Sequence, residues 1–368
     1  MSYSIITPFL VPSHMALKKR VNIGDGFILQ SIQKLLQPLK CETVLSSRVP
    51  LSDQDIAQLN STQFVVLAGA NQLTDDFSIV PKMTLSRLKS IQVPIIPFGI
   101  GIYGEDRKNR AMSLETKDIL REIHSRIPYS SWRCSRTTAY LTRELPELAD
   151  KALMTGCPVT YANRQPPSKK SLNKTQVDLN TVKRVAITVT ERADFWEREH
   201  ATVSFVSQKF KRAKKILALH QDYFIPELDF DFDTLKALAK LELTGQYKKT
   251  PLMLRRLAKK SGFKVFIPQS VEECFSFYQK IDLHIGSRLH AHLYCLSQYK
   301  PSFLTYVDDR CMGFSEDLDF PICEVDRLES YLDYDFSRCQ TNIQARSSVM
   351  TDFVNNIKET YAEAALAT

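Results

Sequence analysis

Short apolar runs alternate with helix-like stretches through the first half of the chain. Residues 4–10, 64–68 and 94–98 are apolar runs of strand length, and each leads into a loop rich in small or turn-forming residues. A helical pattern occupies residues 27–36, directly after a glycine-containing loop at residues 22–26. This alternation is typical of an open parallel α/β sheet, whose ligands bind at the carboxyl ends of the strands.

The first half closes with a predicted strand at residues 130–134, a helix at residues 136–143 and the segment 154–160. The next stretch, residues 163–176, is polar, carries prolines and shows no periodicity. These properties predict an interdomain linker.

The alternation resumes after this stretch. The predicted strands are residues 185–190, 215–220, 264–267 and 301–306, and the predicted helices are residues 200–213, 252–261, 272–279 and 343–366. Pro251 suits the start of the second of these helices, because its missing N–H costs nothing there. We expect the long last helix to cross back and pack on the first domain.

The length of 368 residues exceeds one typical domain and favours two. We predict an N-terminal α/β domain over residues 1–165, a linker over residues 166–182 and a C-terminal α/β domain over residues 183–339. The C-terminal helix, within residues 340–368, would join the first domain.

The composition is that of a globular protein, with 43% hydrophobic and 24% charged residues. No apolar run approaches the ~20 residues that span a bilayer. The N-terminal residues carry no basic stretch ahead of their apolar positions, so they resemble a first strand and not a signal peptide. We therefore expect a cytoplasmic protein.

The eight cysteines are scattered, and no C-x-x-C pair occurs. This spacing argues against a structural zinc site and against a secreted disulfide framework, and we expect buried, reduced thiols. No cluster of ligand side chains in the sequence demands a metal ion.

The net charge of +8 is concentrated in basic clusters at residues 18–20, 209–215, 248–249 and 255–260. The sequence has no helix-turn-helix, zinc-finger or aromatic-rich RNA-binding pattern, so we expect no nucleic-acid partner. The clusters fit either solvated helix faces or peripheral attraction to the anionic inner face of a membrane.

The densest group of reactive side chains lies at residues 281–295, Ile-Asp-Leu-His-Ile-Gly-Ser-Arg-Leu-His-Ala-His-Leu-Tyr-Cys, where three of the seven histidines fall within nine positions. Apolar residues lead into Gly286-Ser287 and a helical pattern follows, which predicts a strand, a tight turn and a helix. Backbone N–H groups of the turn, with Arg288 and His290, would form an anion site with a proton donor. The alternative is a helix start whose histidines cap or pack.

Three other loops carry weaker signals. In the loop Asn22-Ile-Gly-Asp-Gly26, Asp25 would either cap the next helix or act on a substrate hydroxyl. Gly99-Ile-Gly-Ile-Tyr-Gly104 matches G-x-G-x-x-G, but a polar run follows it, and we interpret it as a strand end and not as a dinucleotide site. Arg133 follows a predicted strand and would either clamp an anionic group or pair with a nearby carboxylate.

Together these segments resemble the polysaccharide pyruvyl transferase family over about residues 15–325. The most specific part is Gly286-Ser-Arg-Leu-His-Ala291, followed by Lys300-Pro301 and by Tyr306-Val-Asp-Asp-Arg-Cys-Met-Gly-Phe-Ser-Glu-Asp-Leu318. Also similar in order and spacing are Asn22-Ile-Gly-Asp25, Gly99-Ile-Gly101, Arg133-Cys-Ser-Arg-Thr137 with Tyr140-Leu141, and Thr155-Gly-Cys-Pro158.

Two positions depart from the family pattern. A strand end that commonly carries three glycines is here Ala68-Gly-Ala-Asn71, and a customary lysine is replaced by Arg310. Neither change removes an expected catalytic residue, but each would alter a donor or acceptor loop.

The resemblance implies two Rossmann-like α/β domains in a GT-B-like arrangement, with a cleft between them and the C-terminal helix crossing back. It implies a transferase that moves pyruvate from phosphoenolpyruvate to two hydroxyls of a galactose- or mannose-type sugar, in an exopolysaccharide or cell-surface glycan. The product would be a cyclic ketal, with phosphate released. The acceptor would be a sugar or a lipid-linked oligosaccharide on the N-terminal side, and phosphoenolpyruvate a co-substrate on the C-terminal side, with no other cofactor.

Roles for individual residues follow as hypotheses. His290 would be the general acid, Asp25 the base and Arg288 the catalytic cation, whereas His292 is expected to be structural because it points away from His290. The expected donor-binding residues are Arg133, Gly286, Ser287, Arg288 and Leu289, with the two arginines clamping the donor from opposite sides of the cleft. The expected acceptor-binding residues are Asn22, Asp25, His220, Asp222 and Arg310; packing or capping is the alternative for His220 and Asp222.

Two other functions compete with this one. A GT-B glycosyltransferase would share the architecture but take a nucleotide sugar, with an acidic residue such as Glu316 on the donor ribose. A non-catalytic binding module would keep the fold without the chemistry. The joint presence of Arg133, Arg288 and His290 argues against it.

Overall fold

The sheet of the first half is parallel, as the alternation of strands and helices predicts. The computed structural model describes residues 2–10, 22–104, 110–164, 175–190, 195–220 and 251–363. One sheet has the order β2-β1-β3-β5, formed by β1 (Ser2–Thr7), β2 (Lys40–Ser46), β3 (Phe64–Ala68) and β5 (Ile95–Phe98). Two short parallel pairs complete this half, β4 (Asn71–Leu73) with β6 (Gly101–Ile102) and β7 (Ser130–Trp132) with β8 (Ala152–Met154).

The second half contains a six-stranded parallel sheet in the order β11-β10-β9-β12-β13-β14. Its strands are β9 (Arg184–Thr188), β10 (Lys214–Ala218), β11 (Lys264–Phe266), β12 (Leu283–Gly286), β13 (Ser302–Thr305) and β14 (Ile322–Cys323). The central strands β12 and β13 are buried throughout, as expected for parallel strands that helices cover on both faces.

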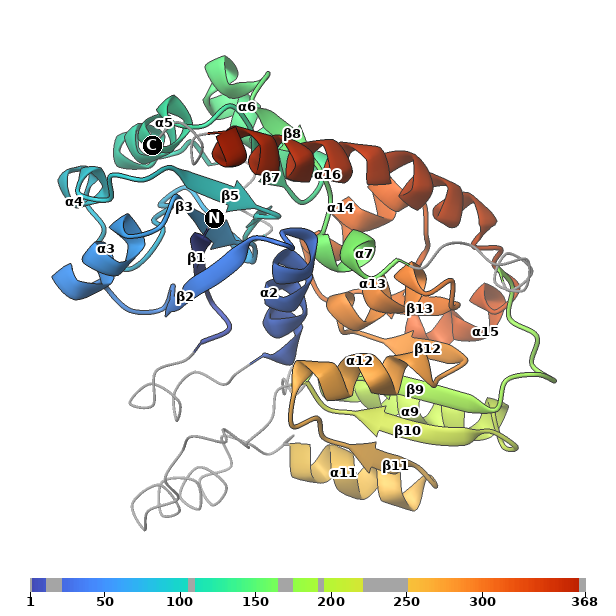
Figure 1. Ribbon diagram of the computed structural model, residues 1–368. Helices are drawn as coiled ribbons and strands as arrows, with labels where there is room; N and C mark the ends of the chain where they lie inside the picture. Colours follow the sequence, from blue (N-terminus) through green and yellow to red (C-terminus); the bar gives the residue numbers. More distant parts are fainter. Residues whose placement is uncertain are drawn as a thin grey trace, which may run out of the picture.

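Helices pack around both sheets (Figure 1). In the first half they are α2 (Ile23–Leu35), α3 (Asp53–Asn60), α4 (Leu85–Lys89), α5 (Leu114–Ser125), α6 (Ser135–Glu144), the 3₁₀ turn Pro146–Leu148 and α7 (Pro158–Ala162). In the second half they are α9 (Trp196–Lys209), α11 (Pro251–Lys260), α12 (Val271–Gln279), α13 (Leu289–Ser297), α14 (Asp309–Leu318), the 3₁₀ turn Val325–Arg327, α15 (Leu328–Tyr331) and α16 (Ser337–Glu363).

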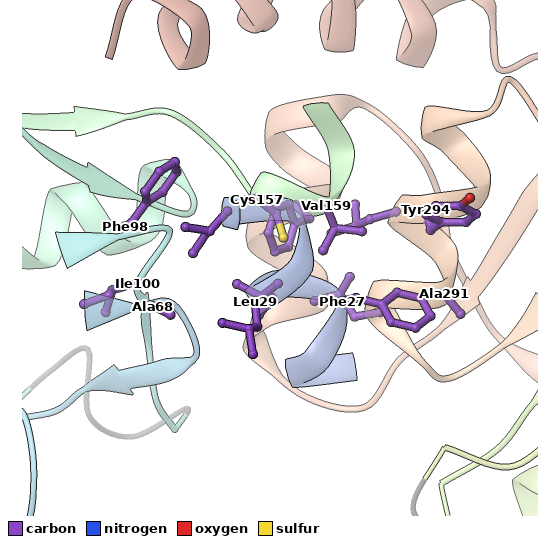
Figure 2. Close-up of a cluster of buried hydrophobic side chains, with 14 of the residues drawn as sticks. Phe27, Leu29, Ala68, Phe98, Ile100, Cys157, Val159, Ala291 and Tyr294 are labelled. Carbon is purple, nitrogen blue, oxygen red and sulfur yellow. The ribbon is translucent and has the colours of Figure 1, made fainter. Parts of the chain in front are cut away.

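Helix α2 joins the two halves through its buried face. The ring of Phe27 lies 4.7 Å from that of Phe275 and 6.0 Å from that of Tyr294, measured between centroids. Figure 2 shows Phe27 between Ile100 of the first half and Ala291 and Tyr294 of the second. The apolar core is therefore continuous across the halves, and separating them would expose it to water.

The motif segment that follows β13 also holds the halves together. The Asp317 carboxylate accepts a hydrogen bond from the Ser135 N–H at the start of α6 (2.8 Å). A Cβ on Gly313 would lie 2.8 Å from Cys134 Sγ, so glycine allows α14 to approach α6 this closely. Gly313 and Asp317 thus form a contact between halves outside the cleft described below.

The C-terminal helix α16 crosses back over the first half, as predicted (Figure 1). Phe353 packs edge-on against Phe98 with centroids 5.1 Å apart, and Tyr361 stacks on Phe64 at 4.6 Å. The helix begins at Ser337, ahead of the predicted residue 343.

The strand Phe64–Ala68 is found where it was predicted, and the other predicted elements occur with ends shifted by a few residues. Among the elements that the sequence analysis missed are β2, α3, α5 and α14. Strand β2 is half-exposed and begins Lys-Cys-Glu, so its apolar alternation is weak. Helix α5 buries the polar Thr116 and His124, which obscured its apolar face. The predicted linker falls largely on residues 165–174, outside the described part of the chain.

All eight cysteines are unpaired, and seven of them are buried. This confirms the expectation of buried thiols that pack as small apolar side chains. No helix in the described ranges is both long enough and apolar enough to span a membrane.

Candidate active site

A cleft of about 850 Å³ is lined by residues from both halves of the protein. Arg48 follows β2, Asn71 lies beyond the end of β3, and Ser287 follows β12, so the cleft lies at the carboxyl ends of the strands, where ligands of parallel sheets bind. Its lining includes most of the predicted site residues: Asn22, Asp25, His220, Ser287, Arg288, Leu289, His290 and Arg310.

The turn after β12 depends on Gly286. Its φ of +147° is rare for residues with side chains, and a Cβ there would lie 2.0 Å from the Thr188 carbonyl oxygen. This close approach lets the Ser287 N–H donate to Thr188 O (3.1 Å) and the Arg288 N–H donate to Thr188 Oγ1 (3.2 Å). Arg288 Nε donates to Val189 O at 2.8 Å. The turn therefore fixes Arg288 as the N-cap of α13.

The loop before α2 brings a second helix start to the same place. Asn22 caps α2 by accepting a hydrogen bond from the Gly24 N–H (3.2 Å), so Asp25 is not the cap. A Cβ on Gly24 would lie 2.7 Å from His290 Nδ1, and the Ile23 N–H donates to His220 O at 3.1 Å. The N-termini of α2 and α13 thus meet at His290, and each contributes partial positive charge.

Asp25 is the carboxylate at this meeting point. Asn22 Nδ2 donates to its Oδ1 at 3.3 Å, and Arg48 Nη2 lies 3.7 Å from its Oδ2. Burial raises the pKa of Asp25 above its usual value, and nearby arginines oppose that rise; in order of effect they are Arg48, Arg310, Arg133 and Arg288. A carboxylate with a raised pKa is a better base than an ordinary one near neutral pH.

Arg288 and Arg310 lie close enough to repel each other. Burial, and then the charge of Arg310, lower the pKa of Arg288 to about 9, while Asp25 partly offsets them. Arg310 Nε donates to Asp308 Oδ1 at 2.7 Å. The structure therefore groups Arg310 with the cationic part of the cleft around Arg288, whereas the sequence analysis expected it at the acceptor.

Arg133 lies behind the wall of the cleft and does not line it. Its side chain is only 2% exposed, and it donates from Nε to Gly99 O (3.2 Å) and from Nη1 to Asn71 Oδ1 (2.9 Å). Its Nη2 has no hydrogen-bond partner among the residues that the structure describes. Burial lowers the pKa of Arg133, and Arg310 adds to the effect. Arg133 is thus neither a surface arginine nor in direct view of the cleft.

His290 lines the cleft, and its surroundings disfavour the protonated imidazolium. Burial lowers its pKa well below the ordinary value, and the positive charges of Arg133 and Arg310 lower it further. Its Nε2 has no hydrogen-bond partner among the described residues. The predicted imidazolium is therefore disfavoured here, because it would add a cation to a cationic site.

His284 and His292 lie away from the cleft in a buried hydrogen-bond network. His292 Nδ1 lies 2.8 Å from Ser302 Oγ, and His284 Nδ1 lies 2.7 Å from the same oxygen. Burial lowers the pKa of His292 to about 3. This environment agrees with the expectation that His292 is structural.

His220 lines the cleft, but its Nε2 points into the core, where it lies 2.6 Å from Tyr278 Oη. Burial lowers the pKa of His220 to about 3. The packing alternative therefore describes its imidazole. Asp222 lies outside the described residues.

Arg48 and Asn71 are cleft residues that the sequence analysis missed. Arg48 Nε donates to Pro8 O at 2.6 Å, which holds the guanidinium near Asp25. The signal that could have found Arg48 is its position after a strand, but that strand, β2, was not predicted. In the described ranges no group of three or more His, Cys, Asp or Glu side chains is arranged to hold a metal ion.

A family model described as polysaccharide pyruvyl transferase matches residues 22–309. None of the curated proteins matches the chain. Among solved structures, Staphylococcus aureus MnaA in complex with UDP is similar over 97% of this chain and 96% of that chain, with a TM-score of 0.53 and 13% identity. UDP-GlcNAc 2-epimerase from Neisseria meningitidis, bound to UDP-GlcNAc, covers 96% of this chain and 99% of its own, with a TM-score of 0.47 and 12% identity.

The similarity to MnaA spans nearly the full length of both chains and concerns the fold alone. It confirms the predicted mixed α/β architecture with parallel sheets in a GT-B-like arrangement.

Proposed function

The chain belongs to the polysaccharide pyruvyl transferase family, and we propose that it transfers a pyruvyl group from phosphoenolpyruvate to two hydroxyls of a galactose- or mannose-type glycoside. The acceptor is carried on a polysaccharide or a lipid-linked oligosaccharide; the products are a cyclic ketal and phosphate. The observation that carries the proposal is the convergence of two helix N-termini and two arginines, Arg288 and Arg310, around the cleft-lining His290.

The cationic part of the cleft suits a small ligand with two anionic groups. Phosphoenolpyruvate carries a phosphate and a carboxylate, and Arg288 and Arg310 supply one guanidinium for each. The Ser287 and Leu289 region at the start of α13 adds the helix N-terminus. Arg133, behind Asn71, contributes its charge from a distance and positions Asn71 through its hydrogen bond.

Donor binding also prepares the acid. The anionic groups of phosphoenolpyruvate offset the guanidinium charges that disfavour a protonated His290, so its pKa rises when the donor is bound. The imidazolium then delivers its proton to the methylene carbon of the donor, and C2 becomes an oxocarbenium-like centre.

The acceptor hydroxyls then form two bonds to C2. The first hydroxyl attacks C2 and gives its proton to Asp25, whose pKa burial raises. The C2–O bond to phosphate breaks next, and phosphate leaves with the proton that Asp25 took from the first hydroxyl, which restores the Asp25 carboxylate. The second hydroxyl closes the ring, and its proton restores His290. Of the two hydroxyl protons, one replaces the proton placed on the methyl group and the other leaves on phosphate.

The test is phosphate release from phosphoenolpyruvate with methyl β-galactoside or methyl α-mannoside as acceptor. Arg288→Ala and His290→Ala are expected to lose most of the turnover, whereas the exposed Arg256→Ala and His200→Ala serve as matched controls. Near-wild-type turnover in both cleft variants would overturn the proposal.

A nucleotide-sugar donor is the second candidate, because the chain shares its fold with MnaA, a protein solved with UDP. Glu316, the residue expected on the donor ribose, instead pairs with Arg136, whose Nε donates to Glu316 Oε2 at 2.7 Å, and it does not line the cleft. Thermal-shift measurements with phosphoenolpyruvate, UDP-sugars and GDP-sugars separate the two donors. Stabilisation by phosphoenolpyruvate with no turnover on any acceptor would favour the non-catalytic module.

A further inference from the structure

A second part of the cleft wall differs in chemistry from the cationic part. It consists of residues 74–81 and Tyr103, which we call the 74–81 wall. Asp76 and Ser78 supply a carboxylate and a hydroxyl, and the exposed Pro81 supplies apolar surface. No lysine or arginine occurs in residues 74–81. This wall is therefore unsuited to the phosphate or carboxylate of the donor.

The 74–81 wall is held in place by hydrogen bonds from a neighbouring helix. The Phe77 N–H donates to Thr116 Oγ1 at 2.8 Å, and the Ser113 N–H donates to Asp75 O at 2.9 Å. The side chains of Phe77 and Ile79 are buried, and they alternate with those of Asp76 and Ser78, which are exposed or partly exposed. A wall fixed in this way presents its polar groups without an ordering cost on binding.

Tyr103 places an aromatic ring beside this wall. Its N–H donates to Leu73 O at 2.9 Å, which fixes its backbone next to Thr74. The side chain lines the cleft and is 53% exposed, among the more exposed large hydrophobic side chains described. Tyrosine combines an apolar ring face with a polar edge, a combination suited to a ligand with both kinds of surface.

We propose that the 74–81 wall and Tyr103 form a subsite for a neutral sugar unit of the acceptor, next to the unit that receives the pyruvyl group. Pyranose rings have an apolar C–H face, which packs on the Tyr103 ring, and hydroxyls, which donate to the Asp76 carboxylate. Asp76 repels phosphate, so the acceptor is directed here and the donor to Arg288 and Arg310. This inference rests on the proposed function for the identity of the neighbouring site.

The test compares Tyr103→Ala and Tyr103→Phe with Tyr129→Ala. Tyr129 is also exposed (39%) but lines a separate groove against α16, so it controls for loss of a surface ring. Saturation-transfer NMR measures binding of lactose and of α-1,6-mannobiose without donor. Phosphate release then gives KM for each disaccharide and for phosphoenolpyruvate.

We expect Tyr103→Ala to raise the disaccharide KM by roughly tenfold and to weaken the saturation-transfer signal, with the KM of phosphoenolpyruvate unchanged. Tyr103→Phe keeps the ring and is expected to stay near wild type, and Asp76→Asn to show a smaller rise than Tyr103→Ala. The subsite would be overturned if Tyr103→Ala and Tyr129→Ala had the same KM for the disaccharides. It would also be overturned if the wild type gave no saturation-transfer signal with either disaccharide. A Tyr103-dependent signal without any turnover would support the subsite and refute the proposed function, and a Tyr103-dependent signal from UDP alone would assign the ring to a nucleotide.

Discussion

His290 and His292 stand two residues apart on α13, and their surroundings are opposite. His290 lines the cleft and contacts Gly24 of the first half. His292 lies in the core, where its ring packs against Phe320 with centroids 4.4 Å apart and its Nδ1 pairs with Ser302. Two residues rotate the side chain by about 200° around the helix axis, roughly half a turn. One imidazole therefore lines the cleft and the other packs in the core, although spacing in the sequence does not distinguish them.

The buried hydrogen-bond network around His292 also supports the residues that line the cleft. Ser302 Oγ has one proton, so it donates to one of the rings of His284 and His292 and accepts an N–H from the other. His284 Nε2 lies 2.8 Å from Thr188 Oγ1, the oxygen that accepts the Arg288 N–H. The network thus ends at the backbone of the residue that we assign to the donor.

The largest effect is expected at the cleft side, from Arg288→Ala. Loss of one cation aimed at the donor should lower kcat/KM by roughly 10²–10³-fold. Arg288→Lys should recover only part of this, because an ammonium cannot bind two oxygens in a plane. Thermal unfolding should change little, because removing this guanidinium also removes its repulsion with Arg310. A fall in melting temperature that matches the loss of activity would instead indicate a structural role.

His290→Asn and His292→Asn test the comparison directly. We expect the first to lower kcat by roughly 10²-fold, the range of a lost general acid, with the melting temperature nearly unchanged. The second should leave kcat within a few-fold and lower the melting temperature. If both variants lose activity in proportion to stability, the division between the two faces of α13 is wrong.

We expect His292, on the buried face of α13, to affect the free energy of unfolding and the dependence of that free energy on pH. His292→Ala removes a packed ring and one partner of Ser302, which should reduce the free energy of unfolding by roughly 2–4 kcal/mol. Burial lowers the pKa of His292 to about 3, from an ordinary 6.5. Above pH 6.5 the histidine is neutral in both the folded and the unfolded chain, so its contribution is constant there.

As the pH falls below 6.5, the unfolded chain gains a proton that the folded chain does not, and the wild type loses roughly 1 kcal/mol per pH unit from this histidine. His292→Ala lacks this loss, so the gap in stability between the two proteins should narrow as the pH falls. Denaturant unfolding at pH 8, 6 and 5 measures the gap. A gap that stays constant would contradict a neutral, buried His292.

The sequence predicted the α/β class, most strands and the strand-turn-helix of the main motif, because these depend on local periodicity and on Gly286. It could not place Arg133, whose burial behind Asn71 depends on the pairing of β4 with β6, or Arg48, which follows an edge strand of weak pattern. Nor could spacing alone distinguish the motif residues Gly313 and Asp317, which hold α14 to α6, from residues of the cleft. The position of each of these residues depends on contacts between segments that are distant in the sequence.

The smallest expected effect is the uptake of a fraction of a proton per protein molecule when the donor binds. Because burial and nearby guanidinium groups lower the pKa of His290, an anionic donor should raise it, and binding should take up protons from the buffer. Titration calorimetry of phosphoenolpyruvate in buffers of different ionisation enthalpy measures this uptake near neutral pH. The donor's own phosphate also titrates there, so the informative quantity is the difference between the wild type and His290→Asn. His292→Asn is the matched control and should reproduce the wild-type uptake, because the core network keeps that ring neutral with or without donor. Equal uptake in His290→Asn and the wild type would remove the argument that donor binding creates the acid.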